Sequence, residues 1–167
     1  MSKRVVITGV GTINPLANNV PDYVSAIKNG ECGIDQISYF DTEGYSTRIA
    51  AEVKSPDFSD ILDPKEIRRT SRFIIFALKA AMEAVRNSGL EITESNANDI
   101  GVEIGSGIGG IEVLEQTTRT LIAKGPSKVS PFTVPMMIID MAAGLVSIKT
   151  GAKGPNSSSV TACASST

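Results

Sequence analysis

Apolar and polar positions follow two different periods along this chain, which predicts strands interleaved with helices. β-Branched apolar residues at 4–9 predict a buried strand, and the alternating residues 100–104 predict a second one. Helical spacing of apolar residues runs from Asp63, which begins an N-capping sequence with Pro64 and Glu66, to Gly89, a typical helix stop. Strands that alternate with helices indicate an α/β fold.

The other segments are assigned in the same way. Residues 21–29 form a predicted helix that ends at Gly30, with an apolar face of Tyr23, Val24 and Ile27. Further predictions are a short strand at 48–53, a helix at 111–123 closed by Gly125, a loop at 128–135, a helix at 136–148 that ends at Gly151, and a last strand at 157–162. The 136–148 segment is apolar almost all round, which predicts a helix buried on every side.

The last eight residues, Val160 to Thr167, point to chemistry. An apolar strand end runs directly into Cys163, which is flanked by small residues. Small neighbours allow a tight strand-to-helix turn and close approach of a substrate to sulfur, which is the geometry of a nucleophile elbow. A thiol at a helix start also feels the positive end of the helix dipole, which favours the thiolate.

A glycine loop at residues 105–110, Gly-Ser-Gly-Ile-Gly-Gly, follows the second predicted strand. It fits the G-x-G-x-x-G pattern of dinucleotide-binding domains. However, the loop lies far from the N-terminus, and no acidic residue ends a second strand about 20 residues later. The favoured interpretation is that these glycines let the loop pass close to another backbone or to a substrate.

Composition restricts the class of protein. The 167 residues correspond to one domain or part of one, and the net charge of −2 argues against a nucleic-acid-binding surface. No apolar run is long enough to span a membrane, and two cysteines give no disulfide framework, so a cytoplasmic protein is expected. Cys32 is predicted to be an unreactive packing or loop residue. The chain has no histidine, so Cys163 cannot be activated by a histidine of its own chain.

Several motifs together carry a family resemblance. They are Thr8-Gly9-Val10-Gly11, the glycine loop, Ser130-Pro131-Phe132 with Val134-Pro135, Gly154-Pro155 and Thr161-Ala162-Cys163. In this order and spacing they resemble the β-ketoacyl-[acyl carrier protein] synthases, and most closely the type II enzymes of bacterial fatty-acid synthesis. The resemblance implies a thiolase-like fold, in which two similar α/β halves stack as α-β-α-β-α layers, and a homodimer without a cofactor.

The same resemblance implies an acyltransferase that performs a decarboxylative Claisen condensation. Cys163 would receive the acyl group from acyl carrier protein, and malonyl carrier protein would then lengthen it by two carbons. Ile108 would gate the acyl pocket. Phe132 and Thr133 would lie in the loop that approaches the partner subunit's acyl channel, and many family members carry a second aromatic residue where this chain has Thr133.

Family members are much longer, and the histidines and lysine that assist decarboxylation lie beyond the equivalent of Thr167. Residues 1–167 are therefore expected to be the N-terminal portion of a synthase domain, inactive in condensation alone. The alternative is a catalytically inactive, truncated thiolase-like subunit or interaction module. Arg68, Arg69 and Arg72, here called the basic cluster, are candidates for contact with an acidic carrier protein, the alternative being a solvated helix face.

Overall fold

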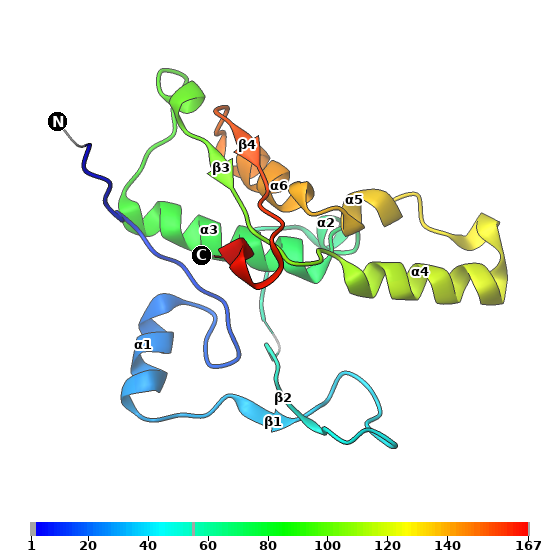
Figure 1. Cartoon of the computed structure of the whole chain (residues 1–167). Helices are drawn as coiled ribbons and strands as arrows, with labels where there is room; N and C mark the ends of the chain where they lie inside the picture. The colour runs from blue at the N-terminus through cyan, green and yellow to red at the C-terminus, as the bar shows by residue number, and fades with distance from the viewer. Residues whose placement is uncertain (1–2, 55, 167) are drawn as a thin grey trace.

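The computed structural model describes residues 3–54 and 56–166. Its centre is a pair of packed helices, α3 (Arg72–Ser88) and α6 (Asp140–Thr150), beside a short parallel strand pair, β3 (Val102–Glu103) and β4 (Asn156–Ser157). In Figure 1 these elements form the body from which α4 extends to one side and the β1–β2 hairpin below. The mixture of helices and strands confirms the predicted α/β class.

The hydrophobic core lies between α3, α6 and the segment before α2. Leu62, Ile75, Leu78 and Val146 form a buried cluster, and Val102 of β3 packs against it. Removal of this apolar surface from water is the main force that holds the two helices and the parallel strands together.

The predicted helix at 63–89 is interrupted. Its first turn is α2 (Pro64–Ile67), where the Asp63 and Glu66 side chains form the predicted capping box. After Ile67 the hydrogen bonds tighten, because Thr70 N–H binds the Ile67 carbonyl and the Thr70 hydroxyl binds the Glu66 carbonyl. Ser71 is extended and α3 begins after it, ending at Gly89 as expected. The single-helix prediction was therefore wrong at residues 68–71.

The N-terminal run at 4–9 forms no strand, and its side chains are not buried. Val5 is 95% exposed and Ile7 is 86% exposed. The chain instead runs along α3, where Gly9 and Gly11 lie so close that a Cβ on either would overlap a helix carbonyl. The prediction of a buried strand was wrong, because no strand among residues 3–54 and 56–166 pairs with this run.

Helix α1 (Val20–Lys28) follows, capped by the Asn19 side chain as it accepts a bond from Asp22 N–H. The helix is confirmed, but its predicted apolar face is only partly packed: Tyr23 is half-buried, whereas Val24 and Ile27 are exposed. Cys32 lies exposed in the loop after α1, so the loop part of its prediction is confirmed.

Strands β1 (Ile34–Gln36) and β2 (Ile49–Ala51) pair as an antiparallel hairpin, so the strand predicted at 48–53 is confirmed. Strand β1 was not predicted, because its residues Asp35 and Gln36 are polar and give no apolar strand pattern.

The segment between β3 and β4 is mostly helical. It contains α4 (Ile111–Lys124), the short helix η2 (Pro126–Lys128), α5 (Thr133–Met137) and α6, while η1 (Ala97–Asp99) precedes β3. Helix α4 is confirmed, whereas part of the predicted loop at 128–135 is helical. The prediction of one buried helix at 136–148 was wrong in two respects: the chain breaks at Ile138 and Ile139, and Ile148 is 73% exposed. Gly151 ends α6 in a left-handed conformation, as predicted.

Within residues 3–54 and 56–166, no helix has both the length and the apolar character needed to cross a membrane.

Candidate active site

The candidate site begins where the two parallel strands end. The ladder of β3 and β4 is continued by Ile104 N–H, which binds the Ser157 carbonyl, and by Ser106 N–H, which binds the Ser159 carbonyl at 3.2 Å. Because parallel strands end at the same edge of a sheet, the glycine loop and the segment 160–166, here called the elbow, emerge side by side. The strand predicted at 157–162 is thus shorter in regular pairing and begins one residue earlier, at Asn156.

The glycine loop lies directly against the elbow. A Cβ on Gly105 would overlap the carbonyl oxygen of Ser165, and one on Gly107 would lie 3.8 Å from the carbonyl oxygen of Ala162. At its other end, Gly109 has a φ of +74° and Gly110 N–H donates to the Met137 carbonyl at 3.0 Å. The favoured interpretation, close approach to another backbone, is confirmed.

The elbow makes a sharp turn at Ala162, which has a φ of +52°. This left-handed conformation is uncommon for a residue with a side chain and costs about 1–3 kcal/mol. The turn is held by Thr161 N–H, which donates to the Ser165 hydroxyl at 2.8 Å. The chain then enters a short 3₁₀ helix, η3 (Ala162–Ser166), in which Cys163 is exposed. The predicted turn is therefore present, with a 3₁₀ segment in place of the first turn of an α-helix.

An open, mostly apolar cavity of about 530 Å³ lies beside the glycine loop and the strand that leads to the elbow. Ile108 of the loop lines it and is itself 66% exposed. The other lining residues are Ile111, Leu114, Met137, Ile138, Ile139, Asp140, Ser158 and Val160. This cavity is wide enough and apolar enough to receive an alkyl chain.

Phe132 and Thr133 stand apart from Ile108, at the start of α5. The Phe132 ring lies under the Arg69 guanidinium, 4.6 Å from its central carbon, and does not line the apolar cavity. The Thr133 hydroxyl donates to the Ser130 carbonyl at 2.8 Å, and Thr133 lines a second hollow that also includes Arg68 and Lys128. The structure therefore brings Ile108 to the apolar cavity and places Phe132 and Thr133 beside the basic cluster.

The basic cluster is not a uniform solvated face. Arg68 and Arg69 are exposed, whereas Arg72 is half-buried, with its guanidinium over the Tyr39 ring at 4.7 Å and the Phe76 ring at 5.0 Å. Contacts of this kind restrict where the Arg72 guanidinium can lie, so Arg72 is less free to meet a partner than Arg68 and Arg69 are.

A polar cluster on the open face of the β3–β4 pair was not predicted. The hydroxyls of Ser157 and Ser159 both donate to the Glu103 carboxylate. These bonds, that of Ser157 first, hold the pKa of the Glu103 carboxyl below its ordinary value. The alternation of strand 100–104 places Glu103 opposite the apolar residues, but sequence alone does not show which strand lies beside it.

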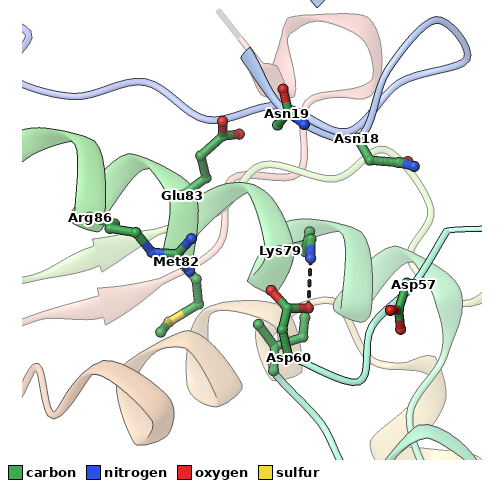
Figure 2. A pocket seen from close by; sticks show the side chains of 9 residues that line it. Asn18, Asn19, Asp57, Asp60, Lys79, Met82, Glu83 and Arg86 are labelled. Carbon is green, nitrogen blue, oxygen red and sulfur yellow. Dashed lines mark hydrogen bonds and ion pairs between the residues drawn. The ribbon is translucent and has the colours of Figure 1, made fainter. Parts of the chain in front are cut away.

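A polar pocket of about 270 Å³ lies on another face of α3 (Figure 2). Lys79 points toward Asp60, and their charged atoms are 2.6 Å apart. Glu83 accepts bonds from the backbone N–H groups of Thr12 and Val20 at 2.9 and 2.8 Å, so it fastens the N-terminal segment and the start of α1 to α3. Lys79, Asp60 and Glu83 are thus engaged with one another or with the backbone, which favours a structural role for them.

No group of three or more histidine, cysteine, aspartate or glutamate side chains suited to holding a metal ion occurs in the part of the chain that the structure describes.

Comparison with known proteins gives consistent results. Residues 2–167 match the family model described as "Beta-ketoacyl synthase, N-terminal domain". The chain is 51% identical over 166 residues to 3-oxoacyl-[acyl-carrier-protein] synthase 2 of Staphylococcus aureus strain COL, and 50% identical over 161 residues to that of Coxiella burnetii. These matches cover 99% and 96% of this chain but only 40% and 39% of the relatives, so the chain spans about two fifths of their length.

Solved structures show the same fold at lower sequence identity. The ishigamide ketosynthase/chain length factor superposes with a TM-score of 0.79 at 23% identity, covering 93% of this chain and 39% of that one. A type II PKS ketosynthase in complex with its acyl-carrier protein gives a TM-score of 0.72 at 22% identity, covering 92% and 41%. The chain thus has the fold of the corresponding part of a thiolase-like ketosynthase.

Proposed function

Because this chain belongs to the β-ketoacyl synthase family, we propose that Cys163 is the acyl-accepting nucleophile of a condensing enzyme of fatty-acid biosynthesis. Residues 1–167 correspond on this proposal to the N-terminal portion of the synthase domain. The observation that carries the proposal is the elbow: Cys163 is exposed directly after the left-handed turn at Ala162, and the glycine loop packs against the same turn.

The first step is a transfer of the acyl group. The Cys163 sulfur attacks the thioester carbonyl carbon of an acyl carrier protein, the bond from that carbon to the carrier sulfur breaks, and the released carrier thiolate takes up the proton that Cys163 gives up. Negative charge develops on the carbonyl oxygen during this attack. The backbone N–H of Cys163 is the donor that this chain offers to it, in the manner of an oxyanion hole.

The second step forms a carbon–carbon bond. A malonyl group on a carrier protein loses carbon dioxide, and the electron pair left on its α-carbon attacks the Cys163 thioester. The bond between the acyl carbon and the Cys163 sulfur then breaks and releases the Cys163 thiolate. The acyl chain, two carbons longer, remains on the carrier protein that brought the malonyl group. Because this chain has no histidine, groups outside it must assist decarboxylation. The purified 167-residue chain is therefore expected to release no carbon dioxide steadily from malonyl carrier protein.

The apolar cavity is the proposed site of the acyl chain. Ile108, in the glycine loop, controls the depth of this cavity. The apolar lining of the cavity and the exposed side chain of Ile108 support this role. Phe132 and Thr133 act on the substrate channel from the α5 side, in a homodimer where this loop approaches the partner subunit. No cofactor enters either step, since the thioester supplies the acyl group and loss of carbon dioxide supplies the carbanion.

The proposed partner is an acyl carrier protein, bound in the cytoplasm, rather than a nucleic acid or a membrane. The exposed guanidinium groups of Arg68 and Arg69 form the contact surface for its acidic side chains. A similar fold occurs in a ketosynthase that was solved in complex with its acyl-carrier protein, which supports a partner of this class.

Two exposed cysteines make the nucleophile testable with an internal control. The chain is incubated with a long-chain acyl carrier protein, and its intact mass is measured with time. We expect one acyl adduct on the unmodified chain and on Cys32→Ser, and none on Cys163→Ser. Equal acylation of both thiols would mean that exposure and not the elbow decides reactivity, and acylation of Cys32 alone would contradict the proposal outright.

A catalytically inactive interaction module is the second candidate. It is favoured by the lack of histidine together with exposed apolar side chains such as Val5, Ile7 and Ile122. Stable self-association of the chain, with no acyl adduct on Cys163, is the result that selects this candidate.

A further inference from the structure

Arg69 makes an unusual contact for a residue of a carrier-binding surface. Its guanidinium lies over the Phe132 ring at 4.6 Å, although the two residues are far apart in sequence. None of the ion pairs found among the described residues involves Arg69 or its neighbour Arg68. The charge of Arg69 is therefore still available to a carboxylate, and the ring is its competing partner.

Phe132 is connected to the apolar cavity through a short helix. It is the N-cap residue of α5, and α5 ends at Met137, the first of three consecutive residues, 137–139, that line the cavity. The Met137 carbonyl accepts the Gly110 N–H at 3.0 Å, so the same helix end is joined to the glycine loop. A displacement of Phe132 is thus transmitted to one wall of the cavity over little more than one helical turn.

Two cationic side chains also lie on the other side of α5, together with the acidic Glu112. Arg68 and Lys128 line the hollow that contains Thr133 and Met136 of this helix. An acidic protein surface that binds Arg68 would be brought close to Arg69 by the adjacency of the two residues in the chain. A carboxylate that pairs with Arg69 competes directly with the Phe132 ring for the guanidinium.

We propose that Arg69 is a positioning residue: it restrains the α5 wall of the apolar cavity through Phe132 and releases that wall when an acidic carrier protein binds. The inference rests on the proposed function, since it takes its partner and its acyl ligand from there. It goes further by making the docking surface and the cavity two coupled sites. A released wall lets the open cavity adapt to an acyl chain, so carrier binding tightens the binding of that chain.

The size of the coupling is bounded by the contact that carries it. A cation–π contact at an exposed site changes an equilibrium by about two- to fivefold, and the carrier cannot shift cavity affinity by more than that through this contact. By linkage, an acyl ligand in the cavity tightens carrier binding by the same factor.

The test measures the affinity of the 167-residue chain for a dansyl-labelled fatty acid by fluorescence, with and without saturating holo acyl carrier protein. We expect the carrier to tighten probe binding about two- to fivefold in the unmodified chain. Arg69→Met should bind the probe tightly without carrier and gain nothing when carrier is added. Phe132→Leu, which keeps the arginine and removes the ring, should behave in the same way.

Arg68→Met is the matched control, because it removes the same charge one residue away without touching a ring. It should weaken carrier binding yet keep the full shift in probe affinity at saturation. A shift that persists in both Arg69→Met and Phe132→Leu, or no shift in the unmodified chain although both ligands bind, overturns the coupling. Failure of the probe or the carrier to bind at all contradicts the proposed function itself, and the inference with it.

Discussion

Two apolar regions of this molecule have similar sequences and opposite environments. Leu78 of α3 and Val146 of α6, at the contact between the two helices, are almost fully buried. In the N-terminal run, by contrast, Val5 and Ile7 are largely exposed. Both regions are rich in large aliphatic side chains. The difference shows that an apolar pattern predicts a tendency to be buried, while burial itself requires a partner surface at the right place.

Truncation of a core side chain sharpens this comparison most strongly. Leu78 has no exposed surface, so Leu78→Ala should lower the free energy of unfolding by about 2–5 kcal/mol in a urea titration. Ile7→Ala is the matched change in the exposed run and should cost no more than about 0.5 kcal/mol. Equal costs for the two variants would mean that residues 4–9 are packed in solution.

A second comparison sets a glycine of the candidate site against a glycine of the core helices. A Cβ at Gly105 meets the Ser165 carbonyl, so Gly105→Ala should destabilise the chain by about 1–3 kcal/mol and slow acyl transfer to Cys163. Gly144 lies inside α6, and a Cβ at this position would meet nothing within 4 Å beyond the helix's own backbone. Gly144→Ala should therefore raise the free energy of unfolding by at most about 1 kcal/mol. Thermal unfolding should show a lower melting temperature for Gly105→Ala and a higher one for Gly144→Ala. An unchanged melting temperature in Gly105→Ala would contradict the close approach of the glycine loop and the elbow.

The smallest expected effect concerns the open face of the strand pair. The pKa of Glu103 lies below its ordinary value of 4.5, so the carboxylate stabilises the fold above that pH and the contribution is lost as the pH falls through the lower, folded value. The free energy of unfolding should therefore fall less steeply with acid in Glu103→Gln than in the unmodified chain. Ser157→Ala should weaken the same dependence, and an unchanged acid profile in both variants would contradict the cluster.

Local signals predicted a large part of the fold. The capping box of Asp63 and Glu66, and the left-handed glycines that end α3 and α6, depend only on neighbours within one turn, so sequence was sufficient for them. The interruption at residues 68–71 was missed because the apolar period continues through it, although the Thr70 hydroxyl binds the Glu66 carbonyl and Ser71 is extended. The helix α5 was missed because Pro131 and Pro135 indicated a loop.

The candidate site divides in the same way. Cys163 and the glycine loop were predicted from small residues at strand ends, and their approach to one another follows from the parallel pairing of β3 and β4. The contact of Arg69 with the Phe132 ring and the bonds of Glu103 to two serines were not predicted, because each joins residues that lie far apart in the sequence. Contacts of this kind depend on which elements become neighbours, and the sequence pattern does not specify this.

The carboxylate of Glu83 has a consequence for how the protein is made. Its bonds to Thr12 and Val20 span 71 and 63 positions of sequence, so these two residues can be held in place only after α3 has been synthesised. The segment around Thr12 and Val20 therefore reaches its final position only after Glu83 has left the ribosome, however early it was itself made.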